Sequence, residues 1–255
     1  MRCQACGQDN PTEARFCSKC GSSLAAVTMP TTVIGVGASY DNGWRQMWKH
    51  FWMLLLILII YWCISWVGSI FGSIFSFIPA AGGDAFVTFM VTSVFFQLAY
   101  NILLVFPLAY GLSFAYLKAA RDDRLEVKDM FAAFHNYWNA VLNFLLVFLI
   151  VVVGFILLVV PGFVFACKLA FTPYLVVDRK MGAIEAIKES WRLTNGHAWK
   201  VFLIGLLAIP IAIAGFICLG VGIIIATIWI TLAFAYLYHA VSSSAGLSNP
   251  KGELA

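Results

Sequence analysis

Long apolar stretches alternate with short charged stretches along most of this chain. A helix needs about 20 apolar residues to cross the hydrocarbon core of a bilayer, which is about 30 Å thick. Six stretches reach or approach that length, and the pattern therefore predicts an all-α integral membrane protein with about six transmembrane helices. The stretches are residues 51–77, 86–117, 140–160, 163–177, 201–219 and 223–240, of which the fourth is short and contains Pro173.

A short amphipathic run precedes the first, third and fifth apolar stretches. The clearest run lies in residues 178–202, where Ile184, Ile187 and Trp191 recur at helical spacing and charged residues occupy other positions. A helix with one apolar and one polar face is expected to lie along the membrane surface. The pattern recurs with Trp44, Met47, Trp48 and Phe51 before the first stretch, and with Val127, Met130, Phe131 and Phe134 before the third.

These runs and stretches indicate an internal repeat. A displacement of 61 residues aligns Trp138 with Trp199 and the Gly-Phe-Ile sequence at 154–156 with that at 215–217. The alternative is chance similarity among apolar residues, together with the preference of tryptophan for membrane interfaces. We predict three repeated units, each a cytoplasmic amphipathic helix followed by a hairpin of two membrane helices.

Composition agrees with lipid as the solvent for much of the surface. The chain is 62% hydrophobic and 11% charged, whereas an ordinary soluble domain is about 45–50% apolar and about 25% charged. The formal net charge of +4 is modest. The distribution of Lys and Arg is more informative, because these residues precede the first, third and fifth stretches and are absent from the other three connections. The positive-inside rule then predicts a multi-pass protein of the inner membrane with both termini in the cytoplasm.

Four cysteines in the polar N-terminus have the spacing of a metal site. Cys3 and Cys6 form one CxxC pair, Cys17 and Cys20 form another, and a glycine follows each pair. Two such turns present four thiolates to one ion in a tetrahedral arrangement, which suits Zn²⁺ better than the alternatives of disulfides or an iron site. Because cysteine takes all four positions and leaves none for water or substrate, the predicted zinc is structural.

The predicted domain order is a zinc ribbon at 1–22, a flexible linker at 23–39, a helical membrane domain at 40–243 and a cytoplasmic tail at 244–255. The charges of the ribbon nearly cancel and Phe16 is its only aromatic residue, so no nucleic acid is expected as a partner. The expected partners are membrane lipids and a protein that contacts the ribbon. A homo-oligomer is compatible with the small residues that recur four apart in the first two apolar stretches.

Residues 161–202, PGFVFACKLAFTPYLVVDRKM followed by GAIEAIKESWRLTNGHAWKVF, resemble the glycerophosphodiester phosphodiesterase membrane-domain family and its polytopic relatives. The resemblance extends over about Trp44 to Ala240 and is specific mainly in these quoted residues. Some members of that family carry a soluble phosphodiesterase barrel, whereas this sequence carries a ribbon. The resemblance therefore implies the membrane architecture and no phosphodiesterase activity.

One charged residue interrupts the apolar stretches. Lys168 is the only Lys, Arg, Asp or Glu inside any of them, and Ser93, Gln97 and Asn101 lie four apart on one face of the second stretch. A charge in such a place is costly unless it is solvated or paired. These four residues are a candidate polar pocket, open to the outside, for an anionic headgroup or solute. The alternative is a lysine that reaches the headgroups or is held by hydrogen bonds.

The sequence contains no motif of a known catalytic class, neither paired acids in the apolar stretches nor a phosphate loop. We therefore expect a protein that is not an enzyme, with a scaffold or envelope-maintenance role as the first hypothesis. The second hypothesis is a transporter or lipid-handling protein that uses the pocket around Lys168.

Overall fold

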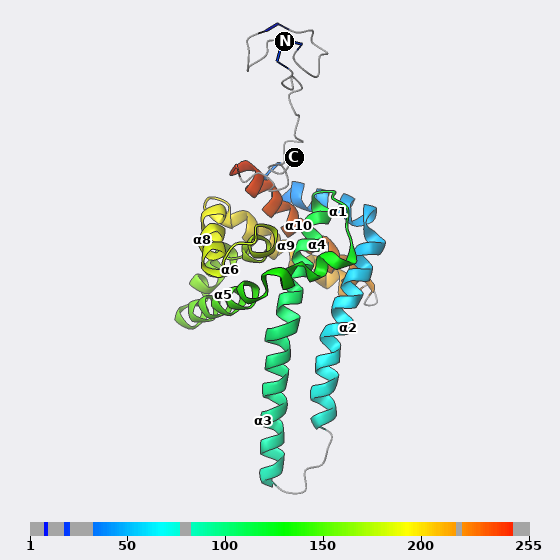
Figure 1. Cartoon of the computed structure of the whole chain (residues 1–255), viewed down its shortest axis with the longest axis vertical. Coiled ribbons are helices and arrows are strands. Elements are labelled where there is room, and N and C mark those ends of the chain that lie inside the picture. The colour runs from blue at the N-terminus through cyan, green and yellow to red at the C-terminus, as the bar shows by residue number, and fades with distance from the viewer. Residues whose placement is uncertain (1–7, 10–17, 21–32, 77–82, 218–220, 247–255) are drawn as a thin grey trace. The chain divides into compact units, whose positions relative to one another are not determined.

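The computed structural model describes residues 8–9, 18–20, 33–76, 83–217 and 221–246. The chain divides into two compact units, Met1–Val33 and Ile34–Ala255. The described part of the second unit consists of helices and contains no strand (Figure 1). The predicted all-α fold is therefore confirmed.

Surface elements and hairpins alternate three times in this unit. The first repeat is α1 (Val36–Lys49), α2 (Phe51–Ser76) and a return helix made of α3 (Gly83–Tyr100), the π-helical η1 (Asn101–Val105) and α4 (Phe106–Ala120). The second is the 3₁₀ element η2 (Val127–Asn136), α5 (Tyr137–Leu157) and a broken return helix, α6 (Val159–Lys168) and α7 (Thr172–Asp178). The third is α8 (Ala183–Thr194), α9 (Ala198–Ile217) and α10 (Val221–Ser244). This order is that of the predicted units, although α1 begins inside the stretch that was expected to be a linker.

Six helical stretches among the described residues are long and apolar enough to cross a membrane. Their number is the predicted one. The stretches are residues 51–68, 91–120, 127–157, 159–178, 198–217 and 222–244.

Two glycines related by the predicted displacement occupy equivalent places. A Cβ on Gly154 would lie 3.1 Å from Cα of Gly162 across the α5–α6 hairpin, and a Cβ on Gly215 would lie 2.7 Å from the carbonyl oxygen of Gly222 across the α9–α10 hairpin. Each glycine thus allows the two helices of its hairpin to approach closely near the turn. This correspondence supports the internal repeat with a shared packing role.

The amphipathic element α8 has a buried face and, apart from it, an exposed apolar stripe. Small or mid-sized residues, including Ala186 and Ser190, are buried against the rest of the unit. The larger apolar residues point outward, since Ile184 is 60% exposed and Trp191 is 42% exposed. An exposed apolar stripe beside membrane-spanning helices fits contact with lipid at the bilayer interface.

The elements α1 and η2 follow the same rule. In α1 the buried residues include Gly43 and Met47, whereas Trp44 and Trp48 are exposed. In η2, Met130 and Ala133 are buried, whereas its two phenylalanines, Phe131 and Phe134, are exposed. Each of the three surface elements therefore buries one face against the protein and leaves at least two large apolar side chains exposed.

Helices α4 and α10 lie at the centre of the unit. Helix α10 packs against α1, α4 and α9, and α4 packs against η2, α7 and α10. The contact between α4 and η2 is unusually close, because a Cβ on Gly111 would overlap the backbone carbonyl of Met130. The largest fully buried side chains include Tyr116 of α4, Tyr238 of α10 and Phe171 before α7.

The fourth apolar stretch differs from its predicted form. Its first helix begins directly after Leu158, which has an extended backbone, so that Pro161 and Gly162 lie inside α6 and not in a loop. Proline is tolerated there because the first turn of a helix has no intrahelical partner for its N–H. The helix then stops after Lys168 and resumes at Thr172.

The first return helix contains a proline, and a side chain from the next repeat donates to a nearby backbone carbonyl. Pro107 has no N–H and therefore cannot be the i+4 donor for the carbonyl of Leu103, which lies in the π-helical turn η1. The hydroxyl of Tyr137 donates to that carbonyl at 2.8 Å from the start of α5. A side chain of the second repeat thus satisfies a backbone group of the first, as an apolar environment requires.

Candidate functional site

A buried ion pair joins the ends of α4 and α7. Arg121 is the C-cap residue of α4, and Asp178 is the last residue of α7. The guanidinium donates through Nη1 to Oδ1 at 2.7 Å and through Nη2 to Oδ2 at 2.8 Å. The two side chains are only 10% and 4% exposed. Such a two-point pair fixes orientation as well as distance, so it locks the first repeat to the second.

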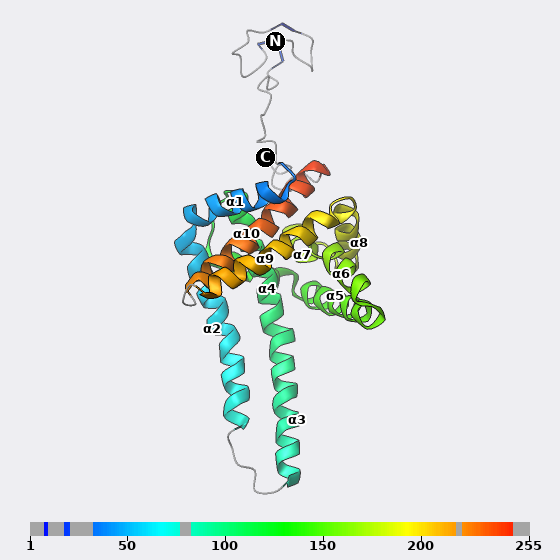
Figure 2. The same cartoon turned by 180° about the vertical axis from the view of Figure 1, so that it is seen from behind.

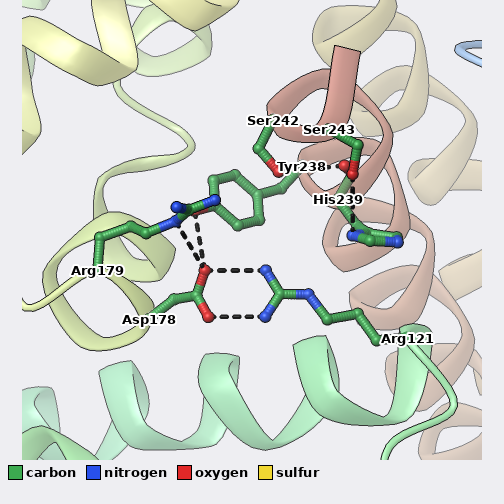
Figure 3. A network of polar contacts seen from close by, with 7 residues as sticks. All are labelled: Arg121, Asp178, Arg179, Tyr238, His239, Ser242 and Ser243. Carbon is green, nitrogen blue, oxygen red and sulfur yellow. Dashed lines mark hydrogen bonds and ion pairs between the residues drawn. The ribbon is translucent and has the colours of Figure 1, made fainter. Parts of the chain in front are cut away.

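The same carboxylate reaches the third repeat. Tyr238 of α10 donates its hydroxyl to Oδ2 of Asp178 at 3.3 Å, and Arg179 places Nε 3.4 Å from the same oxygen. Figure 3 shows the three side chains converging on Asp178 from three directions. We call Arg121, Asp178, Arg179 and Tyr238 the ion-pair node. Through it one carboxylate connects α4, α7 and α10.

Histidine and serine side chains lie next to the node on α10. Ser243 and Nδ1 of His239 are 3.5 Å apart, and Ser242 donates to the carbonyl of His239 at 3.1 Å (Figure 3). These contacts stay within the last turns of α10. They extend the polar region without adding a second carboxylate to it.

The electrostatics of the node favour a fixed charge pair. Burial penalises the charged guanidinium and would lower the pKa of Arg121, but the hydrogen bonds and negative charge of Asp178 outweigh that effect and raise it. Two guanidinium groups share one carboxylate, so the node carries an excess positive charge. The donors of Arg121 that face Asp178 are occupied, which suits a structural tie better than acid or base chemistry.

A second buried pair secures η2. Lys118 of α4 donates to Oδ2 of Asp129 at 2.7 Å, and the side chains are 14% and 9% exposed. The same oxygen accepts the backbone N–H of Glu126, which caps η2. Asp129 therefore fixes both the start of η2 and its position on α4.

The turn after α4 carries an exposed ionic contact with α1. Asp122 pairs with Lys49 and with Nε2 of His50, and these hydrogen bonds lower the pKa of its carboxyl group. Its φ of 63° is left-handed, as at the end of a helix that closes with a Schellman turn. An aspartate tolerates that backbone better than most residues and here also gains two cationic partners.

Sequence reasoning missed the node. In the sequence, Arg121 is one of the Lys and Arg residues that predict the topology, and Asp178 is the first residue of the amphipathic run. The two residues are 57 positions apart, so no local spacing relates them. The available signal was that Asp178 directly follows the apolar residues 174–177, where an unpaired charge would be costly.

The predicted pocket residues lie in two places. The ammonium of Lys168 donates to Oδ1 of Asn195 at 3.2 Å and stands 5.4 Å from the ring centroid of Trp191. Asn101 donates to the carbonyl of Gln97 at 2.7 Å, one turn earlier in the same helix. Helices α3 and α6 are apart in both Figure 1 and Figure 2.

The structure therefore does not bring Lys168 to Gln97 or Ser93. The reason is the early turn at Leu158 and the short α6, which together carry Lys168 to the C-terminal end of α8. Lys168 therefore lies on the side of the surface elements. The sequence had predicted the opposite, a pocket open to the outside. The four residues therefore do not form one pocket in this structure. Binding of an anionic ligand by any of them stays a prediction.

The predicted zinc ligands fall mostly outside the described residues. Cys3, Cys6 and Cys17 lie there, and Cys20, which the structure describes, is exposed. Four thiolates in two CxxC pairs are a donor set that fits Zn²⁺ and would hold it in a closed, structural site. Bound zinc would supply folding free energy to a unit too short for a hydrophobic core.

Comparisons with known proteins give two domain assignments. Residues 139–245, from α5 to the end of α10, match the family described as "Protein of unknown function (DUF975)". Residues 2–24 match a zinc-ribbon domain. The DUF975 match covers the second and third hairpins together with α8, and includes Asp178 and Tyr238 of the node. Neither the curated proteins nor the solved structures gave a match.

Proposed function

We propose that this multi-pass membrane protein is a non-enzymatic scaffold, whose helical unit holds a fixed surface in the membrane and whose zinc ribbon contacts a protein partner. The ion-pair node carries the proposal. Its charges are used to join three hairpins, and Arg121 faces Asp178 with both terminal nitrogens. A membrane scaffold needs such polar contacts between its helices, because lipid supplies no hydrophobic driving force for helix association.

Other polar side chains of the unit support the same role. Within α5, Asn143 is fully buried, accepts from the hydroxyl of Tyr110 and donates to the carbonyl of Ala183, each at 2.8 Å. Near α9, the hydroxyl of Tyr40 donates to the carbonyl of Ile204 at 2.8 Å. These bonds link α5 to α4 and α8, and α1 to α9. Each of these polar groups is therefore occupied by a contact between helices.

The orientation is part of the proposal. The positive-inside rule places the ribbon, α1, η2 and α8 at the cytoplasmic side of the inner membrane. The reducing cytoplasm favours thiolates on zinc over disulfides. The likeness of residues 161–202 to the glycerophosphodiester phosphodiesterase membrane-domain family fits a helical region that positions an attached domain, here the ribbon.

The second hypothesis, a transporter or lipid-handling protein, has less support. Broken membrane helices can offer free backbone groups to a substrate, and the fourth stretch is broken after Lys168. In this break, however, Ser190 and Thr194 of α8 donate to the carbonyl of Lys168 at 2.8 and 3.1 Å. Ser190 also accepts from the N–H of Phe171. The side chains of α8 thus occupy groups that a transported solute would need.

Crosslinking and purification from cells would test the scaffold proposal. The wild-type chain should retain a reproducible set of proteins, and Cys17→Ser, which removes a zinc ligand, should lose them while the membrane unit remains folded. Cys63→Ser is the matched control, because Cys63 is an exposed cysteine of α2 outside the ribbon. Equal capture by wild type and Cys17→Ser would contradict a role for the ribbon in partner binding.

A further inference from the structure

One stripe of α8 combines apolar and cationic side chains at the surface. Ile184, Lys188 and Trp191 are spaced by four and three residues, Asn195 is the C-cap residue of the helix, and all four are exposed. Residues at these spacings share one face of a helix. The stripe therefore presents, in order, an aliphatic group, an ammonium group, an indole ring and an amide.

A second ammonium group reaches this stripe from α6. Lys168 lies over the ring of Trp191 and donates to the side-chain oxygen of Asn195. Trp191 is thus flanked by Lys188 one turn before it and by Lys168 across from it. Because the oxygen of Asn195 accepts from Lys168, its amide nitrogen is left to donate elsewhere.

Neither ammonium group is neutralised in the described part of the chain. Lys168 has only the neutral amide and the ring as partners, and Lys188 has no ion-pair partner there. The neighbouring cation of α8 differs, since Arg192 is paired with Glu189 at 2.6 Å. Two uncompensated charges beside exposed Ile184 and Trp191 fit the interface of a bilayer that contains anionic lipid.

We infer that Lys168, Lys188, Trp191 and Asn195 form a binding site for the phosphate of an anionic phospholipid in the leaflet that contacts α8. The two ammonium groups would flank the phosphate, and the amide nitrogen of Asn195 would donate to one of its oxygens. The indole would lie at the glycerol level, which is the depth that tryptophan prefers. Ile184 would meet the acyl chain.

This inference stands apart from the proposed function. A scaffold without the lipid site, or a lipid site without protein partners, is equally consistent with the fold. The two ideas also rest on different residues, since the node lies at the end of α7 and the lipid site lies on the outward face of α8. Their tests can therefore fail separately.

The test uses the full chain in nanodiscs of phosphatidylcholine with about one quarter phosphatidylglycerol. Phosphatidylglycerol that stays with the protein after transfer to a neutral detergent is measured by mass spectrometry. Losing one hydrogen bond to a charged group lowers affinity about tenfold or more, so Lys188→Met should lower retention about tenfold and Lys168→Met/Lys188→Met by more. The matched control is Lys180→Met, which changes an exposed lysine between α7 and α8 that has no place in the site.

Three outcomes would overturn the assignment. The first is equal retention by wild type and Lys188→Met, a variant that alters an exposed side chain and leaves the fold intact. The second is an equal loss with Lys180→Met, which would indicate general attraction to a charged bilayer. The third is displacement of the lipid from the wild-type protein by millimolar inorganic phosphate, which would assign the site to free phosphate. Retained phosphatidylcholine should be unchanged by all variants.

Discussion

The ion-pair node predicts that two charge-neutralising substitutions have unequal effects. Asp178→Asn removes the one carboxylate that Arg121 and Arg179 share, and it leaves both guanidinium groups in a buried place without it. Arg121→Gln leaves Asp178 with the partners Arg179 and Tyr238. Neutralising the aspartate should therefore destabilise the protein more than neutralising the arginine.

The sizes follow from the burial and the geometry. Removing one partner of a buried pair costs about 3–5 kcal/mol when it strands a charge, and this range applies to Asp178→Asn. Losing hydrogen bonds to a charged group costs about 1.5–3 kcal/mol, which applies to Arg121→Gln because Asp178 keeps a cation nearby. In the double variant one stranded charge is gone, so its cost should be smaller than the sum of the two single costs.

The measurement is the free energy of unfolding in mixed micelles, with increasing fractions of a denaturing detergent and the near-ultraviolet circular dichroism of the aromatic residues as signal. Asp122→Asn is the control, because its ion pairs are exposed and should contribute less than about 1 kcal/mol. If Arg121→Gln proved as costly as Asp178→Asn, or if both resembled Asp122→Asn, the node would not be the tie between the three repeats.

Four further predictions concern separate parts of the chain. Gly111→Ala should lower the free energy of unfolding by about 3 kcal/mol or more, because the added methyl group forces η2 away from α4. Gly37→Ala lies in open space on α1 and should raise the free energy of unfolding by about 0.5–1 kcal/mol. Unfolding in micelles tests both, and a change of the same sign in the two variants would contradict this reasoning. Tyr137→Phe should destabilise by about 1–3 kcal/mol because a backbone carbonyl loses its donor, and an unchanged midpoint would exclude that role. Elemental analysis should find one zinc ion per chain and none in Cys17→Ser; stoichiometric zinc in the variant would refute the four-cysteine site. A reporter fused after Ala255 should be active only in the cytoplasm, and a periplasmic signal would reverse the topology.

Apolar length and residue spacing were sufficient to predict most of the architecture. Six segments, three preceding surface elements and the relation of Gly154 to Gly215 could be read from the sequence, because lipid imposes length and repetition preserves packing positions. The sequence predicted surface helices along the membrane, but it did not predict which residues of each apolar face contact the protein. Met47 and Met130 are fully buried, whereas Trp44 and Phe131 of the same predicted faces are exposed.

The contacts between repeats were beyond sequence reasoning. Arg121 meets Asp178 only after α4, α7 and α10 have packed, and the position of Lys168 depends on a turn placed at Leu158 rather than a few residues later. A shift of three or four residues at one turn moves a side chain by about 5 Å along a helix. Local patterns do not resolve such a shift, and the partners of Lys168 change with it.

The node also orders the biogenesis of the protein. During synthesis the first hairpin and Arg121 leave the ribosome before Asp178, and Tyr238 follows last. Until the second hairpin arrives, Arg121 is an uncompensated cation at the end of α4, where it helps to retain that end at its side of the membrane. Pairing with Asp178 then removes the free charge and closes the first two repeats on each other. A chain halted before α10 would keep this pair but lack the contact of Tyr238 with Asp178.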